Sequence, residues 1–123
     1  MMRVRAIRGA ITVEDNSREA ILEGTRELLV NLIEANALEP EHLISAYFTM
    51  TPDLDAVFPA EAAREMGWNH VPLLCMCEIA VPGALPRCVR TMIHTYTERP
   101  AEHIRHVYLR DAIKLRPDLS MPQ

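Results

Sequence analysis

The chain has 123 residues, of which 49% are hydrophobic, and this length fits one domain rather than two. The formal net charge of −4 argues against a protein that binds a nucleic-acid backbone, because such proteins usually present a basic surface. All of the 13 basic residues except Lys114 are arginine, which permits an anionic ligand, although a biased genome or a preference for heat-tolerant surfaces explains the excess better.

The sequence predicts neither a membrane-spanning helix nor an export signal. No stretch approaches the roughly 20 apolar residues that a membrane-spanning helix needs. The N-terminal residues MMRVRAIRGA reach charged side chains and a glycine before the apolar core of a signal peptide can form. The three cysteines are an odd number, and without an export signal we expect reduced thiols. We therefore expect a cytoplasmic protein.

The first two predicted elements are a strand and a helix. A strand is predicted over residues 3–14, where small and apolar positions interleave with arginines: Val4, Ala6, Gly9 and Ile11. Asn16 and Glu19 have the spacing of a capping box. After them, residues with helical spacing predict a helix that Asn36 and Pro40 end: Ile21, Leu22, Thr25, Leu28, Leu29, Leu32 and Ile33.

The rest of the chain predicts four strands and two short helical segments. Apolar or alternating runs predict strands over residues 43–51, 71–81, 87–97 and 104–109. Pro59 begins a short helix that Gly67 closes, and residues 110–115 form a brief helical turn. The order β-α-β-α-β-β-β predicts a single α+β domain over residues 1–123, with a mixed sheet backed by one long helix.

Metal binding and nucleophilic catalysis find little support in the cysteines and histidines. Cys75 and Cys77 share one face of a predicted strand, but the chain has no C-x-x-C pair at zinc-finger spacing. We expect each histidine to lie at the surface, or in the core with its hydrogen-bonding groups paired. A cysteine nucleophile needs a neighbouring base and a lowered thiol pKa, and the sequence indicates neither. The four glycines form no phosphate-binding loop. Together with the cysteine and histidine pattern, this leads us to expect no metal or cofactor.

Charged residues inside otherwise apolar strands are the unusual feature. Glu78 lies within LLCMCEIAV, and Arg90 shares a strand face with Cys88 and Met92. Burying a lone charge costs several kcal/mol unless it is paired or neutralised. One interpretation of these charges is that Glu78 and Arg90 form an ion pair, or that they lie on solvent-exposed edge strands. The other is a pocket floor for an anionic ligand, to which Arg8 is a third candidate contributor.

Five segments of the chain resemble the AroH-class chorismate mutases, the monofunctional, Bacillus-type family. They are IRGAITVE (7–14), TPDLDAVFPAEAARE (51–65), GWNHVPLLCMCE (67–78), RCVRTMI (87–93) and IRHVYLRDAIKLRPDLS (104–120). The resemblance covers nearly the whole chain in register. It implies a homotrimer with a barrel-like assembly of sheets surrounded by helices, and active sites in the clefts between subunits.

The activity implied is the pericyclic rearrangement of chorismate to prephenate, towards phenylalanine and tyrosine, without a cofactor, a covalent intermediate or proton transfer. By position, Arg90 would contact the breaking ether oxygen and a carboxylate. Arg8 and Tyr108 would hold a carboxylate, and Glu78 would accept the ring hydroxyl. The other implied contacts are Cys75 beside Glu78, then Phe58, Leu73 and Leu74 from a neighbouring subunit, and Arg64 and Arg116 at the mouth.

Two positions depart from the family pattern, and two other functions stay open. Glu61 stands where the best-known relatives have lysine, so attraction of a dianion by that position is lost or reversed. Leu74 stands where they have threonine, which removes a hydroxyl. The alternatives are a non-enzymatic trimer that binds a ligand in its arginine cleft, and an imine deaminase of the Rid type, which is a trimer of related shape.

Overall fold

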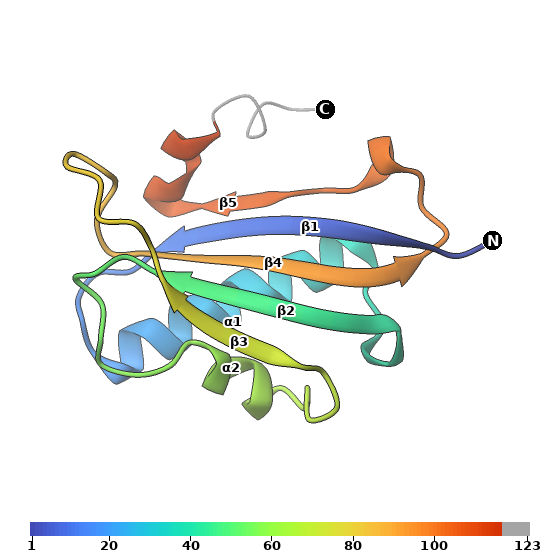
Figure 1. The fold of residues 1–123 in the computed structure, drawn as a ribbon, viewed down its shortest axis with the longest axis horizontal. Helices are drawn as coiled ribbons and strands as arrows, with labels where there is room; N and C mark the ends of the chain where they lie inside the picture. Colours follow the sequence, from blue (N-terminus) through green and yellow to red (C-terminus); the bar gives the residue numbers. More distant parts are fainter. Residues whose placement is uncertain (117–123) are drawn as a thin grey trace.

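The computed structural model describes residues 1–116, which form a five-stranded mixed sheet with two helices on one face (Figure 1). The elements are β1 (Arg3–Thr12), α1 (Arg18–Asn36), η1 (Pro40–His42), β2 (Leu43–Met50), α2 (Ala60–Glu65), β3 (Leu73–Cys77), β4 (Cys88–Thr97), η2 (Ala101–His103), β5 (Val107–Leu109) and η3 (Arg110–Leu115). The strand order across the sheet is β3-β2-β4-β1-β5. β4 is antiparallel to β1 and β2, whereas the edge strands β5 and β3 run parallel to their neighbours. The predicted α+β class with a mixed sheet is confirmed.

Helix α1 begins at a serine cap rather than at the predicted capping box. The Ser17 hydroxyl accepts a hydrogen bond of 3.1 Å from the backbone N–H of Ala20. The Asn16 side chain instead accepts hydrogen bonds from the backbone N–H groups of Asp55 and Ala56. The prediction of a cap at Asn16 is therefore wrong, because this side chain ties the loop before α2 to the start of α1.

The apolar side of α1 packs on the sheet as its spacing predicts. Its leucines are fully or nearly fully buried, and each contributes about 1.5–3 kcal/mol through its removal from water: Leu22, Leu28, Leu29 and Leu32. Gly9 on β1 allows this close approach, since a Cβ there would lie 2.9 Å from Leu32 Cδ1 and 3.0 Å from Leu28 Cδ1. The core therefore lies between the sheet and its helices.

The buried face of β1 differs from the prediction. Ile7, Gly9 and Ile11 are buried towards α1, whereas Val4 and Ala6 are exposed and lie on the opposite face. Successive side chains of a strand point to opposite faces, so Ala6 and Gly9 cannot share one without a bulge. The prediction that grouped Val4 and Ala6 with Ile11 is wrong. Arg8 consequently lies on the face away from the helices.

Two predicted strands are longer than the observed ones. The run 71–81 forms a strand only over Leu73–Cys77, so Glu78 follows β3 instead of lying inside it. The run 104–109 pairs only over Val107–Leu109. The other strands, the short helix α2 and the helical turn η3 agree with their predictions to within a few residues. The last seven positions of the predicted domain lie outside the described residues.

The face of the sheet away from α1 and α2 is covered by neither of these helices (Figure 1). Several large apolar side chains on it are more than a third exposed: Val4, Tyr47, Leu74, Met76 and Tyr96. They alternate along their strands with the buried residues of the core, as a one-sided sheet requires. Neither helix of residues 1–116 has the length and apolar character to cross a membrane.

Candidate active site

Three of the predicted site residues meet in one groove on the open face of the sheet. Arg8, Arg90 and Tyr108 line this groove, which has a volume of about 320 Å³. Strand pairing explains why they converge: Ala10 of β1 is opposite both Arg90 of β4 and Tyr108 of β5. Two guanidinium groups and a phenol hydroxyl are well suited to bind an anion with carboxylate groups. We name this the arginine groove.

Arg90 and Glu78 form an ion pair beside the arginine groove. The Arg90 Nε lies 3.0 Å from Glu78 Oε2, and the Arg90 side chain stays 46% exposed while that of Glu78 is 14% exposed. The Thr49 hydroxyl donates to the same carboxylate oxygen over 2.6 Å. The ion pair that the sequence left as one interpretation is therefore present. Since Arg90 also lines the groove, the pair is compatible with ligand binding.

His106, the residue just before β5, is hydrogen-bonded to the backbone of Arg8. The backbone N–H of Arg8 donates to the His106 Nδ1 over 3.0 Å, at the point where the pairing between β1 and β5 begins. Burial, with the positive charges of Arg8 and Arg116 next, lowers the pKa of His106 below its ordinary value. The imidazole is thus kept neutral, which is the state in which Nδ1 can accept a hydrogen bond.

Phe58 and Cys75 lie in a different groove from Arg90. This second groove, which we name the phenylalanine groove, has a volume of about 630 Å³. Cys75 pairs with the buried Phe48, so its side chain points to the helix side of the sheet, opposite to that of Arg90. Met76 lines both grooves. Within one described chain, Cys75 is therefore not beside Arg90.

Two of the thiols near these grooves, those of Cys75 and Cys88, have a pKa above the ordinary value. Burial raises the pKa of Cys75. Burial, followed by the negative charge of Glu78, raises the pKa of Cys88 to about 11. Nucleophilic cysteines require the opposite shift. Among residues 1–116, no three histidine, cysteine or acidic side chains are grouped so as to hold a metal ion.

Glu61 at the phenylalanine groove is paired with Arg18. The two Arg18 terminal nitrogens donate to the two Glu61 carboxylate oxygens over 2.8 and 2.7 Å. This bond holds the pKa of the Glu61 carboxyl below its ordinary value. Glu61 was expected to repel a dianion, but Arg18 lines the same groove and its positive charge offsets that of Glu61.

Comparison with known proteins decides the family. Residues 4–119 match a family model described as chorismate mutase type I. The chain belongs to this family. Two curated relatives named chorismate mutase AroH match it: one from Thermus thermophilus is 52% identical over 98% of this chain and 99% of its own, and one from Bacillus subtilis is 49% identical over 98% and 95%. The resemblance stated from the sequence is confirmed, and the enzyme class is isomerase, chorismate mutase.

A solved chorismate mutase structure from Clostridium thermocellum has the same fold. It aligns with a TM-score of 0.87 at 51% sequence identity, covering 88% of this chain and 96% of that chain. The sheet and helices described above therefore match a chorismate mutase structure as well as chorismate mutase sequences.

The remaining predicted contacts are dispersed over this chorismate mutase chain. Leu74 is 54% exposed on the open face, whereas Leu73 is partly buried against the core. Arg64 is exposed on α2, and Arg116 follows η3. Sequence reasoning missed Thr49 and His106, because threonine is common in strands and a lone histidine carries no distinctive pattern.

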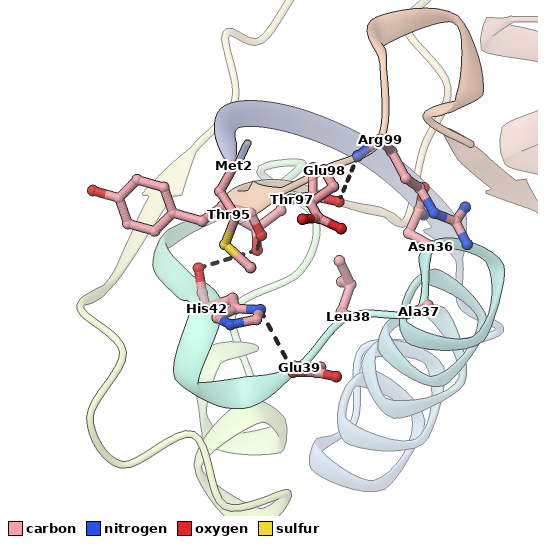
Figure 2. A pocket seen from close by; sticks show the side chains of 11 residues that line it. Met2, Asn36, Ala37, Leu38, Glu39, His42, Thr95, Thr97, Glu98 and Arg99 are labelled. Carbon is pink, nitrogen blue, oxygen red and sulfur yellow. Dashed lines mark hydrogen bonds and ion pairs between the residues drawn. The ribbon is translucent and has the colours of Figure 1, made fainter.

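A further pocket lies at the other end of β4 from Arg90 and has a volume of about 230 Å³ (Figure 2). Two residues of its wall are hydrogen-bonded to each other: the Thr95 hydroxyl donates to the His42 carbonyl over 3.1 Å. Two carboxylates, those of Glu39 and Glu98, line it. Arg99 lines the same pocket, so its lining carries charges of both signs.

Proposed function

We propose that this chorismate mutase rearranges chorismate to prephenate at sites shared between the subunits of a homotrimer. In the reaction one C–O bond breaks while one C–C bond forms within a single molecule, so atoms and electrons balance without a co-reactant. The observation that carries the proposal is the arginine groove, in which two arginines and a tyrosine converge from adjacent strands. We place the reaction in phenylalanine and tyrosine synthesis in the cytoplasm.

The arginine groove supports a division of roles among its residues. The Arg90 Nε is occupied by Glu78, so the terminal nitrogens are left to contact the breaking ether oxygen and a carboxylate. A fixed cation stabilises the negative charge that grows on this oxygen in the transition state, and one such donor is typically worth about 3–4 kcal/mol. Arg8 and Tyr108 hold a carboxylate and keep the flexible substrate compact. Glu78 accepts a hydrogen bond from the ring hydroxyl of the substrate.

The separation of the two grooves supports a site that needs a second subunit. Phe58 is 68% exposed in the phenylalanine groove, and an aromatic side chain gains stability when it is buried against a partner. We propose that Phe58, Leu73, Leu74 and Cys75 of one subunit close the arginine groove of the next, with Arg64 and Arg116 at the mouth. The open apolar face is the surface that the neighbouring subunits cover.

The chemistry needs no proton transfer, and the site is consistent with this. The thiols of Cys75 and Cys88 have raised pKa values, and Glu78 is engaged by Arg90 and Thr49. We propose catalysis by positioning and by electrostatic stabilisation alone.

The test is to incubate the purified protein with chorismate and to follow the loss of its absorbance together with the appearance of prephenate. Conversion that saturates with chorismate supports the proposal. Binding of chorismate without turnover would indicate a ligand-binding trimer instead. No effect on chorismate, with turnover of imines, would indicate a deaminase.

A further inference from the structure

Thr49 lies where three strands bring the Glu78–Arg90 pair together. It is the register partner of Arg90 on β4 and of Met76 on β3. Its hydroxyl donates to Glu78 Oε2 over 2.6 Å, and the same oxygen forms the ion pair with Arg90, 3.0 Å from its Nε. Both of these contacts therefore use one carboxylate oxygen.

The backbone of Glu78 is fixed by the same strand that carries Thr49. The Glu78 N–H donates to the Met50 carbonyl over 2.9 Å, directly after the last residue pair between β2 and β3. The Glu78 side chain is largely removed from water, and a carboxylate in that position needs hydrogen-bond donors. Arg90 is half exposed and long, so it cannot by itself fix where the carboxylate points. The short Thr49 side chain on a central strand can.

We propose that Thr49 is a positioning residue of the site, acting through Glu78 on Arg90. Its hydroxyl fixes Oε2 of Glu78, and this oxygen holds Arg90 by its Nε. The terminal nitrogens of Arg90 are then directed into the arginine groove, and Oε1 of Glu78 is left to accept a hydroxyl of the ligand. The catalytic part of this inference rests on the proposed function, whereas the relay Thr49–Glu78–Arg90 rests on geometry alone.

Substitution of Thr49 by valine keeps its shape and removes the hydroxyl. Because hydrogen bonds to charged groups are among the stronger ones, we expect kcat/KM for chorismate to fall about 10-fold or more in Thr49→Val. Thr49→Ser keeps the hydroxyl and should stay within about twofold of the wild type. Thr95→Val is a matched control, because it removes a threonine hydroxyl bond from the far end of β4 and should leave kcat/KM unchanged.

A double-mutant cycle separates positioning from a structural role. In a Glu78→Ala background, Thr49→Val should cause no further loss of kcat/KM, since the group on which Thr49 acts is gone. Losses that multiply in the double variant would overturn the proposal. So would full activity of Thr49→Val in the otherwise wild-type chain.

A spectroscopic measurement tests the relay independently of turnover. The Nε–H resonance of Arg90 in an NMR spectrum should exchange slowly with water in the wild type and in Thr49→Ser, and faster in Thr49→Val. Equal exchange in all three proteins would contradict the relay. If the wild type fails to convert chorismate, the proposed function is wrong, and this exchange measurement still decides whether Thr49 fixes Arg90.

Discussion

At the scale of single residues, Arg90 shows why a charge in a strand has to be considered with its neighbours. Its Nε faces Glu78 in an ion pair, and its side chain also lines the groove. A guanidinium can make both kinds of contact at once because its five N–H donors form a planar fork. Lysine has the same charge, but its single ammonium group cannot reproduce this geometry.

We therefore expect Arg90→Lys to lower kcat/KM for chorismate by about 100- to 1000-fold, the typical cost of losing one transition-state donor. The fold should be kept, because position 90 is partly exposed on a central strand. Steady-state kinetics and the thermal unfolding midpoint of the same preparation measure the two effects. Turnover close to that of the wild type would show that charge alone suffices at this position.

His106 links the stability of the protein to pH. Its pKa in the folded protein is lowered by burial and by the facing charges of Arg8 and Arg116, whereas the unfolded chain has the ordinary value of 6.5. The unfolded state therefore binds the proton more readily. The stabilisation from the neutral imidazole is complete above pH 6.5 and is lost as the pH falls through the lowered value.

The matching experiment is urea denaturation at a series of pH values and one fixed protein concentration. We expect His106→Asn, whose side-chain oxygen can accept the Arg8 N–H bond without titrating, to lose less stability than the wild type between pH 6.5 and more acidic conditions. Identical pH slopes for the two proteins would rule out this role of His106.

At the scale of elements, one asparagine joins the end of α1 to the segment that leads into β5. Asn36 is buried, and its side chain makes two bonds of 2.8 Å with Arg105: Oδ1 accepts from the backbone N–H, and Nδ2 donates to the carbonyl. β5 follows directly and carries Tyr108. The last residue of the helix thus helps to position a residue of the arginine groove.

Asn36→Ala should lower the free energy of unfolding by about 1–3 kcal/mol, because it leaves buried polar groups of Arg105 without partners. KM for chorismate should rise through the displacement of Tyr108. Asn31→Ala is the control: it removes an exposed amide bond to the Glu27 carbonyl and should change stability by no more than about 0.5 kcal/mol. Equal stability of the two variants in urea would contradict the role given to Asn36.

The order and type of the elements could be predicted from the sequence, but the ends of the edge strands could not. The apolar run continues to Val81, yet β3 stops at Cys77 because its partner β2 ends at Met50. Beyond that point Ile79 is 86% exposed, which hydrophobicity alone would not suggest. The end of a strand depends on a distant partner, and the pattern within the run does not contain that information.

The same limit applies to the site. Alternation along β4 placed Arg90 on the face that lines the groove, Arg8 was a candidate as a charge in an apolar strand, and the family resemblance supplied Tyr108. Thr49 is 29 residues from Glu78, and His106 is 98 residues from Arg8, so their bonds are products of the fold. No local spacing distinguishes these two residues from ordinary strand or surface positions.

At the scale of the whole molecule, a single chain has two incomplete grooves and an open apolar sheet face. The arginine groove has the cations but little enclosure, and the phenylalanine groove has an exposed aromatic wall and a paired Arg18–Glu61. An assembly that covers the open face would remove apolar surface from water and could bring one groove against the other. We propose on these grounds that the chorismate mutase site is complete only between subunits.

Mixing of two defective subunits tests this claim most directly. Arg90→Ala removes one of the two arginines from one groove, and Phe58→Asp places a repelling charge in the other at an exposed position that the fold tolerates. Each variant alone should be nearly inactive on chorismate. After dissociation and reassembly of an equal mixture, about a quarter of the sites would combine two intact halves, and activity should return to that extent. No recovery in mixed trimers that are shown to contain both subunits would contradict a shared site.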